Sequence, residues 1–84
     1  MSNSDLLARI RRVIKEHGRL STDVDGLAPD ADLSQAGMTS HATVNVMLGL
    51  EGEFDIEFPD AMLKRNVFGS IASIQTALEE LNAT

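Results

Sequence analysis

The residue types that do chemistry in proteins are sparse in this chain. There is no cysteine, so a thiolate nucleophile, a disulfide and a cysteine-ligated metal site are all excluded. The only histidines are His17 and His41, and His41 directly follows Ser40. Neighbouring residues on a helix point about 100° apart. Ser40 and His41 are therefore not expected to form the nucleophile–base pair of a hydrolase, which makes this the least favoured function.

The acidic residues do not form a metal-binding pattern. Four acids lie within residues 51–57, but the glycine and the twelfth-position glutamate of an EF-hand loop are missing. His17 is expected near the end of a helix, where a cation is favourable, and nothing gives it a second ligand. No phosphate-binding loop is present. We therefore expect no metal and no catalysis by this chain alone.

One hydroxyl lies at a position suited to modification. Ser40 follows a loop that passes Gly37 and is predicted to begin a helix, with Thr39 as its N-cap. Gly37 has the conformational freedom to turn the chain there. A phosphodiester on Ser40 would be favoured by the free amides and the positive dipole end of the helix. Serines are also common at helix starts as simple caps, so the residues alone leave both interpretations open.

Hydrophobic periodicity predicts an all-α fold, a small bundle of three main helices plus one short helix in a single domain. The elements are expected at about 4–17, 40–53, 60–65 and 70–81, with a long loop over 18–39. Ser4 and Ser70 are predicted N-caps, and Gly18 is predicted to follow the first helix as its C′ residue.

An apolar stripe on each helix is expected to form the core. The stripes are Leu6, Leu7, Ile10, Val13 and Ile14; then Val44, Met47, Leu48 and Phe54, widened by Val46 and Leu50; then Ile71, Ile74, Leu78 and Leu81. The connections should add Leu20, Val24, Leu27, Leu33, Ile56 and Phe58. Gly49 and Gly52 each weaken the second helix by roughly 1 kcal/mol relative to alanine. They indicate either a close approach by another element or a frayed helix end.

Charge is unevenly distributed along the chain. Residues 1–20 hold five bases against two acids, whereas residues 21–60 hold nine acids and no base. An acidic middle disfavours nucleic acid, whose phosphates need lysine and arginine, and suits basic protein partners. A merely solvated surface would have the same composition. The N-terminus lacks a signal-peptide pattern, and no stretch approaches the ~20 apolar residues of a spanning helix. We therefore expect a cytoplasmic protein with no membrane partner.

Three groups of residues together have the spacing of a known family. They are Asp32-Leu33 followed by Gly37-Met38-Thr39-Ser40, the run Glu51-Gly52-Glu53-Phe54-Asp55-Ile56-Glu57-Phe58-Pro59, and Val67-Phe68-Gly69-Ser70. Over nearly its whole length the chain resembles the acyl carrier and peptidyl carrier proteins. The resemblance implies a four-helix bundle without catalysis, with 4′-phosphopantetheine from coenzyme A on Ser40 and with Gly37 and Thr39 beside it. The thiol of that arm would carry an acyl or aminoacyl group as a thioester.

Two residues depart from the family pattern. Thr39 stands where the family usually has aspartate, and His41 where it most often has leucine. Thr39 retains the capping capacity but not the negative charge.

The second helix also lacks the acids that cover its exposed face in fatty-acid carriers. The expected partner surface is Met38, His41, Ala42 and Asn45. Partners that read an acidic helix should bind it weakly. Residues 37–41 are more similar to free-standing carriers charged with amino acids by ligases that resemble class II aminoacyl-tRNA synthetases. We therefore expect an amino-acid or specialised-pathway carrier, not the housekeeping fatty-acid carrier.

The resemblance implies three protein partners for a carrier that works as a monomer. They are a phosphopantetheinyl transferase, a loading ligase and a downstream acceptor enzyme. The alternative is an unmodified, carrier-like interaction module or adaptor subunit. Thr39 keeps this alternative open, because the missing aspartate bears on recognition by the transferase.

Overall fold

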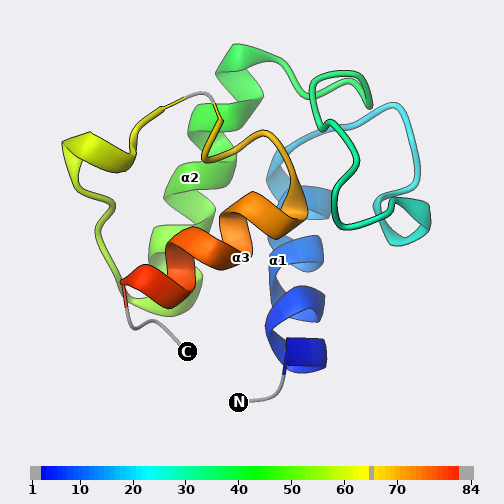
Figure 1. Ribbon diagram of the computed structural model, residues 1–84. Helices are drawn as coiled ribbons and strands as arrows, with labels where there is room; N and C mark the ends of the chain where they lie inside the picture. The colour runs from blue at the N-terminus through cyan, green and yellow to red at the C-terminus, as the bar shows by residue number, and fades with distance from the viewer. Residues whose placement is uncertain (1–2, 65, 82–84) are drawn as a thin grey trace.

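The computed structural model describes residues 3–64 and 66–81, and its α-helices are α1 (Asn3–His17), α2 (Ser40–Phe54) and α3 (Ile71–Glu80). Figure 1 shows α3 running obliquely across α1 and α2, and α1 contacts both of the other helices. Within the described residues there is no strand. The predicted all-α fold is confirmed.

The short fourth helix predicted over 60–65 corresponds to a 3-10 turn, Asp60–Met62. Its hydrogen bonds run from the Met62 amide to the Pro59 carbonyl and from the Leu63 amide to the Asp60 carbonyl. These i→i+3 bonds are those of a 3-10 helix. Arg65, at the end of the predicted range, lies outside the described residues. A second 3-10 turn, Val24–Gly26, lies in the long loop and was not predicted.

Both ends of α1 differ from the prediction. The helix already includes Asn3, so Ser4 lies inside it and is not its N-cap. At the other end the left-handed conformation falls on Arg19 (φ 51°), one residue after Gly18. Gly18 is needed for a different reason, because a Cβ there would lie 2.7 Å from the Ile14 carbonyl oxygen and 3.4 Å from Cγ2 of Val46. The end of α1 therefore packs closely against α2.

The predicted inner faces of α1 and α3 are confirmed. The residues of α1 that are buried are Leu6, Ile10, Val13 and Ile14, and those of α3 are Ile71, Ile74, Ala77 and Leu78. Ser70 caps α3 as predicted and forms a capping box with Ser73. A one-sided apolar stripe is thus a sufficient signal for the inner faces of these two helices.

The inner face of α2 was predicted wrongly in part. Its buried residues are four apart along the helix: Ala42, Val46, Leu50 and Phe54. Val44 and Leu48, which were predicted to face inward, are 50% and 55% exposed. Apolar residues occur on several sides of this helix, so periodicity does not single out one face. Packing against α1 decides the orientation.

The long loop over 18–39 packs onto the bundle, as its leucines predicted. Val24 and Leu33 are buried in the core, with Leu20 and Leu27 packed against it. The Arg11 guanidinium donates to the carbonyl oxygens of Val24 (2.7 Å) and Leu27 (2.9 Å). These bonds link α1 to the long loop.

The end of α2 and the segment after it also turn their aromatic residues inward. Phe54 and Phe58 are buried, and Ile56 packs against them from the edge of the core, as predicted. The Phe58 ring meets Phe68 edge-to-face, with 5.2 Å between centroids. This contact joins the residues after α2 to the turn that leads into α3.

Candidate functional site

Ser40 is the first residue of α2, and it is exposed. The N-cap is Thr39, as predicted: its hydroxyl oxygen accepts a hydrogen bond from the Ala42 amide at 3.1 Å. The Thr39 carbonyl accepts from both the amide and the hydroxyl of Thr43, each at 2.9 Å. The Ser40 hydroxyl is therefore held at a well-defined helix N-terminus, where the dipole favours an attached anion.

The turn before Ser40 depends on Gly37. This residue has φ +110°, and a Cβ on it would lie 2.7 Å from Oγ and 2.9 Å from the backbone nitrogen of Ser21. The Ser21 amide and hydroxyl both donate to the Ala36 carbonyl, at 3.1 and 3.0 Å. Gly37 thus lets the two ends of the long loop meet, which directs the chain into α2.

The residues predicted as a partner surface do not all lie on the surface. Met38 and Ala42 are buried, at 5% and 6% exposure, so that prediction was wrong for both. The Met38 amide bonds to the Leu33 carbonyl at 3.0 Å, which places Met38 beside the fully buried Leu33. Ala42 begins the buried stripe of α2. His41 remains exposed and Asn45 is half-buried.

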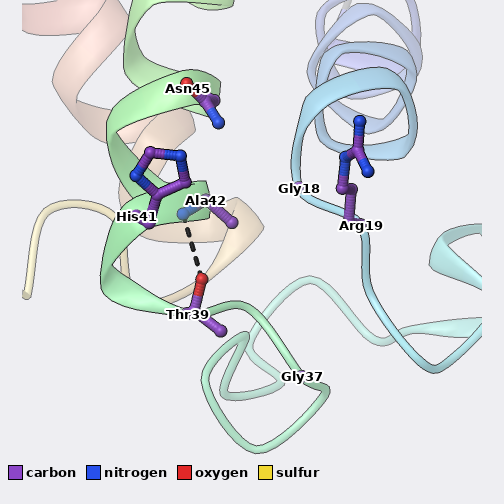
Figure 2. Close-up of a pocket in the computed structure, with 7 residues that line it drawn as sticks. All are labelled: Gly18, Arg19, Gly37, Thr39, His41, Ala42 and Asn45. Atoms are coloured by element: carbon purple, nitrogen blue, oxygen red, sulfur yellow. Dashed lines mark hydrogen bonds between the residues drawn. The ribbon is translucent and has the colours of Figure 1, made fainter.

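A cavity of about 360 Å³ lies on the His41 side of the helix start. Figure 2 shows His41, Ala42 and Asn45 on α2 opposite the turn that carries Gly18 and Arg19. The cation that faces this cavity is Arg19. This small cavity lies beside the candidate attachment point.

A larger cavity, of about 1010 Å³, is lined by Ser40 itself. Its walls come from the long loop, from the first turn of α2 and from the segment that enters α3. Its lining includes Asp30, Asp32, Ser34, Met38, Phe68 and Ser70. Ser40 therefore opens onto a groove that has an apolar part and an acidic part.

The acids near the end of α2 have structural roles. The Glu53 carboxylate accepts hydrogen bonds from Arg9 at 2.8 Å and from Arg12 at 2.6 Å. These bonds, that from Arg9 first, hold the pKa of Glu53 below its ordinary value. The Glu51 carboxylate accepts from the Phe58 amide at 2.9 Å. Both side chains are therefore engaged within the fold and are not displayed for a partner.

Sequence reasoning missed an exposed apolar stripe on α2. Val44 and Leu48 follow Ser40 at intervals of four residues, so the three lie along one side of the helix. The signal was Gly49, for which a close approach by another element was one of the two interpretations: it packs against Val13 and His17 of α1. A glycine inside a helix marks the side that another element approaches, and Val44 lies well away from that side.

Within residues 3–64 and 66–81, no hydrogen bond joins Ser40 to His41, and no three acidic or histidine side chains gather as metal ligands would. No helix among the residues the structure describes is long and apolar enough to cross a bilayer.

The three-helix fold, with a long first loop and an exposed serine at the start of α2, is similar to that of a carrier protein. The family described as phosphopantetheine attachment site matches residues 5–78. The chain belongs to this family, whose covalent prosthetic group is 4′-phosphopantetheine. The exposed Ser40 hydroxyl, with open cavities on both sides of the helix start, fits the attachment of such a group.

Two proteins that are similar to this chain are named aminoacyl carrier proteins. The chain is 47% identical to the aminoacyl carrier protein of Agrobacterium fabrum, over 86% of this chain and 87% of that protein. It is 36% identical to aminoacyl carrier protein 1 of Bradyrhizobium diazoefficiens, over 87% of this chain and 81% of the other.

Solved structures give the same fold. A chain in the crystal structure of an engineered Bradyrhizobium japonicum glycine:[carrier protein] ligase complexed with carrier protein from Agrobacterium tumefaciens and AMP is 46% identical, with a TM-score of 0.85. The match covers 87% of this chain and 97% of that chain. A solution structure from Agrobacterium tumefaciens is 45% identical, with a TM-score of 0.73, and covers 90% of this chain and 92% of that one.

Proposed function

We propose that this protein is an aminoacyl carrier whose Ser40 Oγ bears the 4′-phosphopantetheine arm. The observation that carries the proposal is the exposed hydroxyl of Ser40 at the capped N-terminus of α2. When bound, the arm supplies a thiol that holds the cargo as a thioester, which this cysteine-free chain does not have. The positive end of α2 favours the phosphodiester, and Gly37 and Thr39 hold the backbone that presents it.

An amino acid is the cargo that the observations favour. The relatives named above are aminoacyl carriers, and one similar chain is found in a complex that contains a glycine:[carrier protein] ligase. The exposed face of α2 supports this assignment independently. Its two acids, Glu51 and Glu53, are bonded within the fold, so an enzyme that recognises an acidic helix finds none available here.

The partner surface that we assign is the stripe Ser40, Val44 and Leu48, flanked by His41. Val44 and Leu48 are half exposed although they are apolar, and they lie on the same side of α2 as the candidate attachment point. Apolar side chains at the centre of an interface contribute more to affinity than charges at its rim. A loading ligase would thus bind to α2 beside Ser40, where the arm is attached.

The remaining roles belong to other proteins. A phosphopantetheinyl transferase would attach the arm, a ligase would load it and an acceptor enzyme would take the cargo. The carrier itself would hold and present the arm as a cytoplasmic monomer without catalysis, and without nucleic-acid or membrane partners. Its middle segment of nine acids and no base is unsuited to nucleic acid.

Intact mass spectrometry tests the attachment point. After incubation with coenzyme A and a broad-specificity transferase, the chain should gain one phosphopantetheine, and Ser40→Ala should gain none. The matched control is Ser34→Ala, which removes an exposed hydroxyl from the same groove and should leave the gain intact. No gain with any transferase would instead favour the unmodified adaptor that Thr39 leaves open.

Loading assays test the cargo and the partner surface. The holo protein, with ATP and amino acids, should be charged by an amino acid:carrier protein ligase and poorly by an acyl carrier protein synthetase; the reverse would refute the aminoacyl assignment. Val44→Ser and Leu48→Ser should lower kcat/KM for loading roughly tenfold or more. Leu63→Ser, which alters an equally exposed leucine outside α2, should not change it.

A further inference from the structure

The groove that Ser40 lines has a fixed acidic wall. Asp30 and Asp32 come from the long loop and face the same cavity of about 1010 Å³ as Ser40. The loop is tied on both sides of these acids to the segment that enters α3. The Ala72 amide donates to the Pro29 carbonyl, and the Leu33 amide donates to the Gly69 carbonyl, both at 2.8 Å. The backbone that carries the two aspartates is therefore fixed to the fold, and their side chains are exposed.

The groove also has an apolar part. Met38 and Phe68 line it and are at most 5% exposed. Phe68 is held in place by its edge-to-face contact with Phe58. A flexible arm attached at Ser40 would thus contact apolar side chains, those of Met38 and Phe68. It would also reach the carboxylates of Asp30 and Asp32.

The two carboxylates have capacity for a further partner. One oxygen of Asp32 accepts from the Ser34 amide at 2.9 Å, and the other is not used by that turn. Among the described residues neither Asp30 nor Asp32 is in a salt bridge. An aminoacyl group differs from a fatty acyl group by its α-ammonium, which is a cation near neutral pH.

From this arrangement we infer that the aminoacyl end of the arm folds back into the groove and places its α-ammonium against Asp30 and Asp32. The inference rests on the proposed function and goes further, because it assigns residues of the carrier itself to recognition of the cargo's charge. A neutral acyl group of the same size gains nothing from these carboxylates. The carrier would therefore retain aminoacyl cargo in preference to acyl cargo.

The smaller cavity on the other side of the helix start is unsuited to the same group. Arg19 and His41 line it, and a guanidinium repels an ammonium ion. The two cavities beside Ser40 thus differ in sign, and the cargo's charge selects between them. This difference in the charge of the lining side chains supports the larger groove as the place where the loaded arm binds.

NMR spectroscopy of two loaded forms tests the inference. A transferase would attach pantetheine analogues that end in a stable glycyl amide or in a propionyl amide, its neutral isostere. The amide resonances of residues 30–34 should shift in the glycyl form and much less in the propionyl form. The ratio of arms bound in the groove to arms free in solvent should be roughly 1.5- to 5-fold larger for the glycyl form, as expected for an exposed ion pair. Salt near 1 M should abolish the difference.

Charge-neutral variants provide the control. Asp30→Asn with Asp32→Asn keeps an oxygen that can accept from the Ser34 amide but removes both charges, and it should make the two forms alike. Glu79→Gln with Glu80→Gln removes two exposed charges at the far end of α3 and should preserve the contrast. Equal shifts for both forms in the unmodified sequence would overturn the inference while leaving the proposed function intact. Failure of the analogues to attach to Ser40 would overturn the proposed function itself.

Discussion

His17 at the end of α1 lies directly over Gly49 in the middle of α2. A Cβ placed on Gly49 would be 2.6 Å from Cδ2 of the His17 ring and 2.9 Å from Cγ1 of Val13. The two helices can approach this closely only because position 49 has no side chain. The contact also orients α2, since it turns the Gly49 side toward α1 and leaves Val44 in solvent.

Gly49→Ala should therefore destabilise the protein although alanine is the better helix former. Alanine gains about 1 kcal/mol in helix propensity, but overpacking against the buried Val13 costs about 1–3 kcal/mol. We expect a net loss of about 1 kcal/mol in the free energy of unfolding, measured by urea denaturation. Gly52→Ala is the matched control: a Cβ there meets nothing within 4 Å, so it should stabilise by up to about 1 kcal/mol. Stabilisation by both substitutions would contradict the packing described here.

Gly37→Ala should disrupt the turn that leads into Ser40. At φ +110° an L-residue is strained, and the new Cβ would collide with the backbone of Ser21. We expect a loss of about 2 kcal/mol or more in the free energy of unfolding. Gly26→Ala, in the same loop, adds a Cβ into open space and should change stability by less than about 0.5 kcal/mol. Similar midpoints for the two variants in thermal unfolding would rule out this role of Gly37.

Glu53 should make stability depend on pH in the acidic range. Arg9 and Arg12 lower the pKa of its carboxyl from the ordinary value of 4.5, so the folded state binds its proton less readily than the unfolded state. The stabilisation is complete above pH 4.5 and is lost as the pH falls through the lowered pKa.

Glu53→Gln should consequently lower the free energy of unfolding by roughly 1 kcal/mol at pH 7, because the carboxylate is only 22% exposed and accepts two charged hydrogen bonds. The difference from the unmodified chain should shrink below pH 4.5. Glu57→Gln neutralises an exposed acid nearby in sequence and should show no such trend. A difference that stays constant from pH 7 to pH 3 would argue against the pairing.

Leu48 and Leu50 offer the sharpest contrast on α2. They are two residues apart, but Leu48 is 55% exposed and Leu50 is fully buried. Leu50→Ala should cost about 2–5 kcal/mol, because it removes core contacts and leaves a cavity. Leu48→Ala should alter stability by no more than about 0.5 kcal/mol. Chemical denaturation of the two variants measures this difference, and the reverse order would mean that α2 is rotated.

Much of the site was predictable because its signals are local. The threonine cap, the turn at Gly37 and the capping serine of α3 each act within a few residues of the chain. The stripes of α1 and α3 are one-sided and needed no partner to be recognised. Ser40 was thus placed correctly at a helix start by neighbouring residues alone.

The orientation of α2 was not predictable in this way. Apolar residues surround this helix, so Val44 and Leu48 seemed as suitable for the core as Val46 and Leu50. The same ambiguity put Ala42 on the predicted partner surface, although it is buried; Met38, which precedes α2, is buried against the loop. Only the approach of α1 at Gly49 selects one face.

The sequence by itself therefore determined the helices α1, α2 and α3, the caps of α2 and α3 and the serine that begins α2, because each depends on short-range hydrogen bonds and periodicity. The tertiary structure alone decided which surface surrounds that serine. Arg9 and Glu53 are 44 residues apart in the chain, and Asp32 joins Ser40 and Ser70 around one groove only after folding. Contacts between distant segments leave no periodic trace in the sequence, so Ser40 was found first and the groove beside it only afterwards.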